Sequence, residues 1–332
     1  ARATATLAVR PAGVQQSRAV IARATPDAPL ELDPTGGFLP GTARVRLRVS
    51  GEPAIELLPA LEQLMDYPYG CAEQTASRLV GLIAMPELID RSRGAAAASA
   101  EATTSAGRAE AVRAMIRAGI DRLATMQTRD GGIAYWPGGV RSQPWLTGYV
   151  GWCLLQAART GIDVPAELLE PLLDRLERSL HEDATSDDER ALACRVLTAF
   201  GRPQASWAGG LEADARRLDL AGRSHLAACL LELGRRDRAL AVLGDEIPVT
   251  LGVRPTTSGR LTSAVRQEAM LLETLVRLDS SHPWIPTLVG RVQAARSAGG
   301  ATGHWGTTLD NAAATHALAA VRLARGDAAA AP

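Results

Sequence analysis

The most informative run of the chain is Tyr67-Pro68-Tyr69-Gly70-Cys71-Ala72-Glu73-Gln74-Thr75. Within it, Cys71 and Gln74 are three residues apart, so their side chains lie on one face if a helix begins at the cysteine. Attack of a thiolate on the Gln74 carboxamide, with loss of ammonia, would close a small ring through a thioester. Because a thiolate leaves readily, such a bond acylates far more strongly than the amide it replaces.

The residues around this pair suit a reactive bond that must be kept dry. Water discharges a thioester, and the bulky rings of Tyr67 and Tyr69 stand where they can exclude it. Gly70 can adopt a backbone conformation that a Cβ would forbid, and Pro68 stiffens the approach to the turn. Spacing alone is weak support, because a buried cysteine beside an ordinary glutamine at a helix start would look the same.

Outward from this run, the hydrophobic pattern divides the chain at about residue 52. Residues 1–52 alternate polar and apolar positions, as over 43–49, and are punctuated by turn residues, which predicts β-strands. From residue 53 to about 326 the spacing is helical almost throughout. The break predicts a partial β domain over 1–52, a helical domain over 53–326 and a short tail over 327–332.

One helix is easy to follow in the second part. It comes after Asp163 and Pro165, which suit a first helical turn, and Pro171 either delays its start or bends it. Its apolar stripe consists of Leu168, Leu169, Leu172, Leu173, Leu176 and Leu180. Similar patterns predict helices near 54–66, 73–85, 108–126, 146–160, 187–200, 211–219, 223–243, 261–278, 284–297 and 309–325.

Two segments resemble each other and suggest how the helices are arranged. Residues 130–136 followed by Trp145, and residues 300–305 followed by Thr307, each read as a glycine-rich turn with an aromatic residue and then a helix. Repeated turn-then-helix units are typical of an α/α toroid, in which helix pairs stack into inner and outer rings. The tryptophans at 136, 145, 152 and 305 could line a cavity, but aromatic residues at helix junctions are more often core.

Composition restricts the class of function. Of the 332 residues, 36 are basic and 36 acidic, scattered along the chain, and every basic residue is an arginine. Zero formal charge without blocks of like charge argues against a nucleic-acid or membrane-surface binder. No apolar run approaches the roughly 20 residues that span a bilayer. Both ends read as cut points, so we expect a fragment of a longer protein.

The four cysteines have neither the spacing of a metal site nor that of a disulfide framework. Cys153, Cys194 and Cys229 lie in apolar helical text, which predicts buried free thiols. Cys71 follows an exposed turn, and we expect it to become reactive once the thioester opens, while the other three react slowly. The sequence therefore predicts neither a metal nor another cofactor.

The thirteen residues from Tyr67 to Leu79 resemble the thioester signature of bacterial alpha-2-macroglobulins. The likeness continues through residues 38–43, 126–132, 145–150 and 305–308, so it covers most of the chain. It implies a mainly α fold, with the α/α toroid thioester domain of that family over residues 53–326. It also implies that residues 1–52 belong to a neighbouring β domain of the CUB type.

By the same resemblance, Cys71 is the thioester sulfur and Gln74 is the acyl donor. The shielding and positioning residues of the motif are then Tyr67, Tyr69, Gly70, Pro68 and Glu73, of which Glu73 has no assigned chemistry. In related complement proteins a downstream histidine turns the thioester towards hydroxyl groups. The histidine nearest to that position here is His181, whose surroundings predict a solvated loop.

The family implies a single-use covalent trap for proteases, not an enzyme. A protease cuts a bait segment outside this chain, and one of its lysine amines then attacks the Gln74 carbonyl. The expected partners are target proteases and other domains of the same full-length protein, without nucleic acid or cofactor. Membrane contact is expected only through a lipid anchor outside this chain, and the implied location is the periplasm or cell envelope.

Other functions stay open from the residues alone. Terpenoid cyclases and prenyltransferases share the toroid, but the acidic run at 187–189 does not form their DxDD or DDxxD patterns. A cysteine hydrolase would need convincing histidine and acid partners for Cys71. The toroid could also be a scaffold or a surface-attachment module without an active thioester.

Overall fold

The described part of the chain is mostly helical. The computed structural model describes residues 36–45, 70–84, 105–247, 263–298 and 304–325, together with positions 29, 31, 33, 57, 60, 64 and 65. A short 3-10 helix, η2, spans Ala215–Arg217. The α-helices are α2 (Ala72–Ala84), α4 (Ser105–Ala124), α5 (Pro144–Arg159), α6 (Ala166–Ser179), α7 (Asp187–Ala199), α8 (Ala205–Ala213), α9 (Leu220–Glu232), α10 (Arg236–Leu243), α11 (Ala264–Leu278), α12 (Ile285–Ala298) and α13 (Thr308–Ala324).

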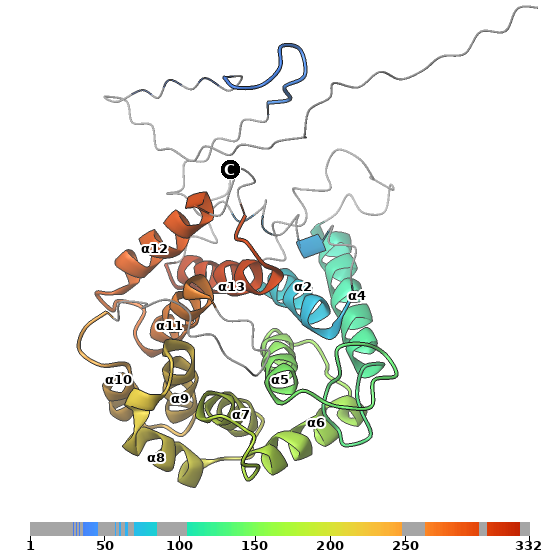
Figure 1. The fold of residues 1–332 in the computed structure, drawn as a ribbon, viewed down its shortest axis with the longest axis vertical. Coiled ribbons are helices and arrows are strands. Elements are labelled where there is room, and N and C mark those ends of the chain that lie inside the picture. The colour runs from blue at the N-terminus through green and yellow to red at the C-terminus, as the bar shows by residue number, and fades with distance from the viewer. Residues whose placement is uncertain are drawn as a thin grey trace, which may run out of the picture.

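These helices form two concentric rings (Figure 1). Helices α2, α5, α7, α9, α11 and α13 make the inner ring, in which each packs against the next and α13 returns to pack against α2. Helices α4, α6, α8, α10 and α12 lie outside it, each against an inner neighbour. From α4 onward the chain alternates between the outer and the inner ring. The predicted α/α toroid is therefore confirmed.

Burial explains which helices lie inside. In the inner helix α5 every residue from Trp145 to Ala157 is buried, and a helix that is buried all round must have neighbours on every side. The outer helix α6 buries most of the predicted leucine stripe, of which Leu169 is only partly buried, and acidic and basic residues cover much of its other face. One apolar stripe is enough for a helix that packs only inward.

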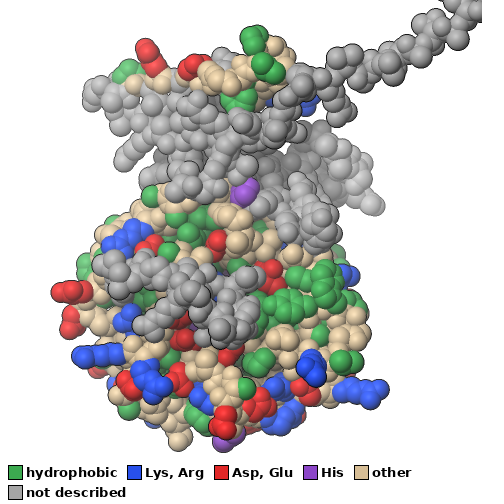
Figure 2. All heavy atoms as spheres, in the orientation of Figure 1, with side chains coloured by type: hydrophobic (Ala, Val, Ile, Leu, Met, Phe, Trp, Pro, Cys, Tyr) green, Lys and Arg blue, Asp and Glu red, His purple; other side chains and the backbone are tan. Residues whose placement is uncertain are grey.

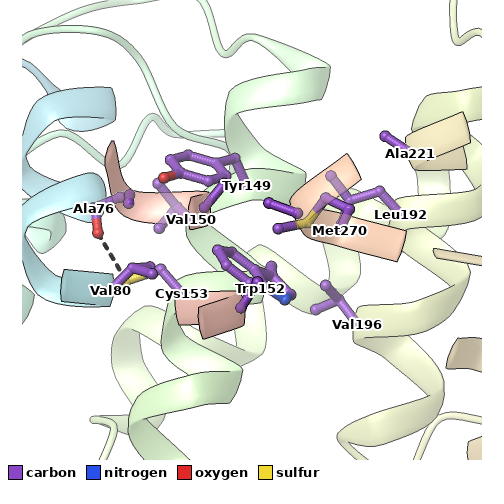
Figure 3. Close-up of a cluster of buried hydrophobic side chains, with 14 of the residues drawn as sticks. Ala76, Val80, Tyr149, Val150, Trp152, Cys153, Leu192, Val196, Ala221 and Met270 are labelled. Atoms are coloured by element: carbon purple, nitrogen blue, oxygen red, sulfur yellow. Dashed lines mark hydrogen bonds between the residues drawn. The ribbon is translucent and has the colours of Figure 1, made fainter. Parts of the chain in front are cut away.

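Aromatic and aliphatic side chains fill the middle of the ring (Figure 3). Trp152 of α5 is 1% exposed, and its ring stacks on Tyr149 with 5.8 Å between the centroids. Cys153 is also buried, and its thiol donates to the Ala76 carbonyl of α2 at 3.5 Å. Cys194 and Cys229 are likewise buried free thiols, as predicted. Of the junction tryptophans, 145, 152 and 305 are core, whereas Trp136 is largely exposed.

One charged pair lies inside this core. Arg195 of α7 is fully buried and donates from Nη2 to both carboxylate oxygens of Glu273 in α11, at 2.8 Å each. Its Nη1 lies 3.2 Å from His225 Nδ1 of α9. Removing one partner of such a pair leaves a buried charge uncompensated, so three inner helices depend on it.

Several predicted boundaries are corrected by the structure. The single helix predicted near 223–243 is two helices, because Gly234 between α9 and α10 has a φ of 74°. The helix predicted near 211–219 starts earlier, as α8, and ends at Ala213. It contains the pair Gly209-Gly210, whose low helix propensity hid it, and packing against α7 and α9 holds it. Helix α6 begins at Ala166, directly after Pro165, and includes Pro171, so the proline does not delay its start.

The predicted β segment is not seen in the part of 1–52 that the structure describes. Residues 36–45 form turns and irregular backbone, including positions 43–45, where a strand was expected. Most other residues of 1–52, and the tail 327–332, lie outside the described residues. Of the helix predicted near 54–66, positions 60, 64 and 65 are helical, Leu57 is not, and the remaining positions are not described.

The surface carries mixed charge. On the face shown in Figure 2, acidic and basic side chains are interspersed around the ring and are not gathered by sign. None of the helices in the described part of the chain combines the length and apolar character needed to cross a bilayer. In the same part, no three histidine, cysteine or acidic side chains group as they would around a metal ion.

Candidate functional site

Cys71 and Gln74 lie at the first turn of α2. The helix starts at Ala72, so Cys71 occupies the N-cap and Gln74 is the third helical residue. The Cys71 backbone N–H donates to Gln74 Oε1 at 3.2 Å. The backbone amide of Gln74 lowers the pKa of the Cys71 thiol. The Gln74 side chain thus folds back onto the N-cap N–H, which is the half of a capping box that the third helical residue supplies.

The thiol at this turn is enclosed. Cys71 is only 6% exposed, although that is more than the other three cysteines, which are 0% exposed. Burial raises the pKa of the Cys71 thiol and outweighs the backbone hydrogen bonds that lower it. A site that excludes water in this way suits a bond that water would cleave.

The segment before α5 forms one wall of the site. The Tyr135 carbonyl accepts a hydrogen bond from the Ala72 N–H at 2.9 Å, so this segment is attached to the residue that follows Cys71. The ring of Tyr135 packs against Trp145 with 6.1 Å between the centroids. Burial raises the pKa of the Tyr135 phenol, and the neighbouring Cys71 and Glu73 add to the shift. Tyr135 thus adds aromatic surface beside the pair.

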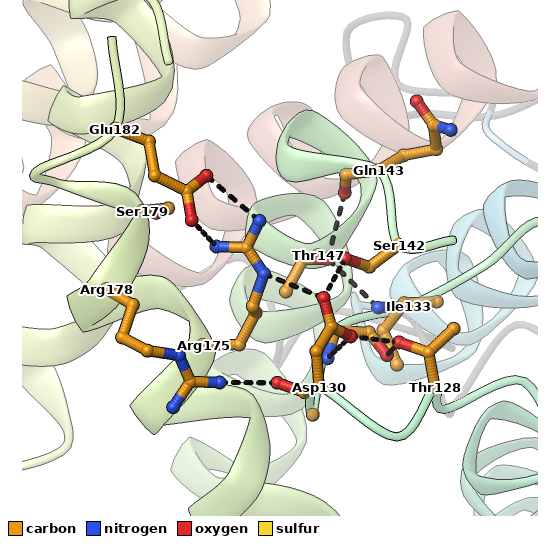
Figure 4. A network of polar contacts seen from close by, with 12 residues as sticks. Thr128, Asp130, Ile133, Ser142, Gln143, Thr147, Arg175, Arg178, Ser179 and Glu182 are labelled. Atoms are coloured by element: carbon orange, nitrogen blue, oxygen red, sulfur yellow. Dashed lines mark hydrogen bonds and ion pairs between the residues drawn. The ribbon is translucent and has the colours of Figure 1, made fainter. Parts of the chain in front are cut away.

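A polar network fixes this wall to the outer ring (Figure 4). The Asp130 carboxylate accepts hydrogen bonds from Ser142 Oγ at 2.7 Å and from the Gly132 N–H at 3.2 Å. It also pairs with Arg175 Nε of α6 at 3.1 Å. Burial opposes ionisation, but hydrogen bonds from Thr128, Ser142 and Gly132, with the Arg175 charge, lower the pKa of Asp130 to about 2. An ionised Asp130 therefore ties the wall to α6 at neutral pH.

The residue before the cysteine is held from α4. The Gly70 carbonyl accepts two hydrogen bonds from Arg122, one from Nη2 at 2.8 Å and one from Nε at 3.2 Å. A Cβ at Gly70 would lie 2.7 Å from Arg122 Nη2, so a larger residue would displace the guanidinium. Gly70 has no positive φ. The predicted need for glycine therefore arises from close approach and not from backbone conformation.

Glu73, for which the sequence indicated no role, is a buried carboxylate that joins α2 to both of its inner neighbours. Its Oε1 accepts hydrogen bonds from Ser77 Oγ at 2.7 Å and from Thr308 Oγ1 of α13 at 2.8 Å. Ser77 Oγ also lies 2.9 Å from Tyr149 Oη of α5. Burial raises the pKa of Glu73, against the hydrogen bonds from Ser77 and Thr308 and the Arg266 charge, which lower it. Three helices thus meet at the residue beside Gln74.

The two similar segments of the sequence flank this site. One leads into α5 and the other into α13, and both of these helices pack against α2 (Figure 1). Each delivers one contact to the motif, since Tyr135 binds the Ala72 N–H and Thr308 binds Glu73. The repeat therefore places the motif between two equivalent turn-then-helix units.

The remaining predicted residues are less informative. Tyr67, Pro68 and Tyr69 lie outside the described residues. His181 is exposed at the end of α6, where its ring packs edge-on against Trp207 with 5.3 Å between centroids, so the solvated-loop interpretation agrees with its position. Arg122, Tyr135 and Thr308 are site residues that the sequence did not single out.

Comparison with known proteins gives the same architecture. Residues 50–181 match the A-macroglobulin TED domain. The chain is 30% identical over 265 residues to an alpha-2-macroglobulin of Xylella fastidiosa, a match that covers 75% of this chain and 16% of that protein. It is 34% identical over 145 residues to the alpha-2-macroglobulin of Escherichia coli K12, covering 44% of this chain and 8% of that protein. The chain therefore spans only a small part of these relatives.

Solved structures show the same fold. Native alpha-2-macroglobulin from Escherichia coli, spanning domain MG7 to the C-terminus, superposes with a TM-score of 0.68 at 23% identity and covers 82% of this chain and 43% of that chain. A Salmonella alpha-2-macroglobulin reacted with methylamine superposes with a TM-score of 0.66 at 23% identity, over 82% of this chain and 18% of that one.

Proposed function

Because this chain belongs to the bacterial alpha-2-macroglobulin family and carries its TED domain, we propose that Cys71 and Gln74 form an internal thioester that captures proteases covalently. The acceptor is a lysine amine of the captured protease. Each thioester reacts once, so the reaction is a single acyl transfer and not catalysis.

The chemistry has two steps. In the first, Cys71 Sγ attacks the side-chain carbonyl carbon of Gln74, so that a C–S bond forms and the C–N bond breaks. The amide nitrogen leaves as ammonia and takes the thiol proton. In the second, a neutral amine attacks the same carbon, an amide bond forms, the C–S bond breaks, and a proton from the amine passes to the Cys71 thiolate. The products are one new amide at Gln74 and one free thiol.

The observation that carries this proposal is the hydrogen bond from the Cys71 N–H to the Gln74 side-chain oxygen at 3.2 Å. It folds the Gln74 carboxamide back onto the residue that carries the sulfur before any reaction. The buried position of Cys71 supports the same proposal, because it keeps water from a thioester.

Two further observations agree with an amine as the acceptor. The related Salmonella protein was crystallised after reaction with methylamine, and structures of the Escherichia coli protein represent it activated by trypsin and by porcine elastase. This chain contains no lysine, so none of its own side chains offers a primary amine to the thioester. An incoming protease would supply that group.

The other proposed features follow from family membership. We place the toroid over residues 53–326, with part of a CUB-type domain before it and a tail after it. Its partners are target proteases and the other domains of the full-length protein, which would carry the bait segment. The proposed location is the periplasm or cell envelope, with any lipid anchor outside this chain.

A capture assay on the full-length protein tests the proposal. After incubation with a trypsin-like protease, we expect a conjugate that survives detergent and reductant, with Gln74 joined to a lysine of the protease. Cys71→Ala and Gln74→Ala should give none. A protease whose lysines are dimethylated should still cleave the full-length protein but should not be captured by it, because a tertiary amine cannot form the amide. Equal amounts of conjugate from wild type and Cys71→Ala would leave only the scaffold or surface-attachment function.

A further inference from the structure

The peptide unit between Gly70 and Cys71 is held at both ends. On one side its carbonyl oxygen accepts two hydrogen bonds from the Arg122 guanidinium, at 2.8 and 3.2 Å. On the other side its N–H donates to the Gln74 side-chain oxygen at 3.2 Å. Because a peptide unit is planar and rigid, the orientation of the carbonyl fixes the orientation of the N–H.

We infer that Arg122 is a positioning residue for the thioester chemistry: through this peptide unit it keeps the Cys71 N–H aimed at the carbonyl oxygen of Gln74. The inference rests on the proposed function, since it concerns the same acyl group. Arg122 touches neither reacting atom in this structure, and its effect passes through the peptide that it holds.

The Cys71 N–H lies where charge develops during the reaction. When the Cys71 sulfur or an incoming amine attacks Gln74, the carbonyl oxygen becomes an oxyanion. A backbone N–H already bonded to that oxygen stabilises the oxyanion more than the neutral carbonyl. Two hydrogen bonds from a cation to the other end of the peptide polarise it and strengthen this donor.

Two neighbouring backbone donors are already bonded to other groups. The next backbone N–H, of Ala72, is already bonded to the Tyr135 carbonyl at 2.9 Å. The N–H of Thr75 bonds to the Cys71 carbonyl at 2.9 Å, as in an ordinary helix. Among the backbone donors of this first turn, only that of Cys71 is bonded to the acyl oxygen.

Gly70 fits the same inference from the opposite side. A Cβ at this position would lie 2.7 Å from Arg122 Nη2 and 3.0 Å from its Nε, so any other residue would push the guanidinium away. Gly70→Ala should therefore reproduce the loss of Arg122 without altering α4. If the two residues act through one contact, the double variant should be no worse than either single variant.

The test uses the purified protein, with methylamine as the nucleophile. Wild type, Arg122→Gln, Arg122→Met and Gly70→Ala are compared for the fraction of chains lighter by one ammonia and for the rate of methylamine uptake. Arg122→Lys is avoided, because a lysine would bring an amine to the site. Arg113→Gln is the matched control, since Arg113 lies on α4 with 60% of its side chain exposed. Circular dichroism checks that each variant is folded.

A spectroscopic signature separates positioning from simple support of the fold. Infrared spectra of protein carrying ¹³C at the glutamine side-chain carbonyl report the hydrogen bond to the thioester oxygen. We expect methylamine uptake about 10-fold slower or more in the Arg122 and Gly70 variants, and a shift of the carbonyl stretch to higher wavenumber. Arg113→Gln should match wild type in both.

The outcomes distinguish this inference from the proposed function. If the wild-type protein has its sequence mass and does not react with methylamine, both the thioester and the role of Arg122 are overturned. Alternatively, wild type could show the mass deficit while the folded Arg122 and Gly70 variants take up methylamine at the wild-type rate and with an unchanged carbonyl stretch. That result would overturn the role of Arg122 but not the thioester.

Discussion

The Glu73 carboxylate accepts a hydrogen bond from Thr308 Oγ1 at 2.8 Å, across 235 positions of the sequence. Glu73 is in α2 and Thr308 is the first residue of α13, so this bond joins helices from opposite ends of the described toroid where the ring closes. Glu73 is also the residue directly before Gln74. Closure of the ring and support of the candidate site therefore depend on the same contact.

Thr308→Val tests this contact. The substitution keeps the shape of the side chain but removes the hydroxyl donor to a carboxylate that is 4% exposed. We expect the free energy of unfolding to fall by about 1–3 kcal/mol, measured in urea, because a buried acceptor loses a partner. Thr308→Ser keeps the hydroxyl, so it should lower the free energy of unfolding by less. Equal stability of the valine and serine variants would show that the bond contributes nothing.

Glu73 also predicts a dependence on pH. Burial raises the pKa of Glu73 in the folded protein. A carboxyl group with a raised folded pKa contributes most below its unfolded pKa, and that contribution is lost as pH rises through the folded pKa. Stability of wild type relative to Glu73→Gln should therefore decline as pH rises above about 4.3, by at most about 1.4 kcal/mol per pH unit.

Urea titrations of both proteins between pH 4 and 8 measure that difference. Glu110→Gln serves as the control, because Glu110 lies on α4 with 57% of its side chain exposed. A stability difference between wild type and Glu73→Gln that is constant with pH would mean that Glu73 does not titrate as its burial implies.

The three core cysteines should be slow to react with thiol reagents. Cys153 and Cys194 are fully buried, and burial raises the pKa of each thiol far above its usual value. In Cys71→Ala, native protein should therefore show no fast thiol with Ellman's reagent, and three thiols should appear after denaturation. Rapid labelling of the native variant would mean that the ring opens far more readily than its packing indicates.

The absence of lysine has a chemical consequence. An amide from Gln74 to a side chain of this chain requires a primary amine, and residues 1–332 contain none. After the thioester has discharged, peptide mapping should find Gln74 hydrolysed or joined to an external amine. A cross-link from Gln74 to another side chain of the same 332 residues would contradict this.

How much of this could be predicted from the sequence depends on distance along the chain. Cys71 and Gln74 are joined by one helical turn, so their spacing was enough to pair them. Arg122 and Thr308 reach the motif from 52 and 235 positions away, and no local pattern links them to it. Tertiary packing of α4 and α13 against α2 brings them there.

Two of the helix predictions were wrong for a related reason. Hydrophobic spacing predicted a helix correctly wherever the sequence has a clear apolar stripe, as in α6. It gave one helix over 223–243, because leucine and alanine continue on both sides of Gly234, whose positive φ ends α9. It missed the start of α8, where contacts with neighbouring helices outweigh the poor helix propensity of two glycines.

The most direct test of the thioester is the intact mass of the protein before and after methylamine. We predict that the protein is lighter than its sequence mass by one ammonia. Methylamine should then add once, at Gln74, and release one titratable thiol, at Cys71. Cys71→Ala and Gln74→Ala should abolish the deficit and the uptake while the toroid stays folded. An unchanged sequence mass, no methylamine adduct and a Cys71 that reacts freely before any amine is added would contradict the proposal.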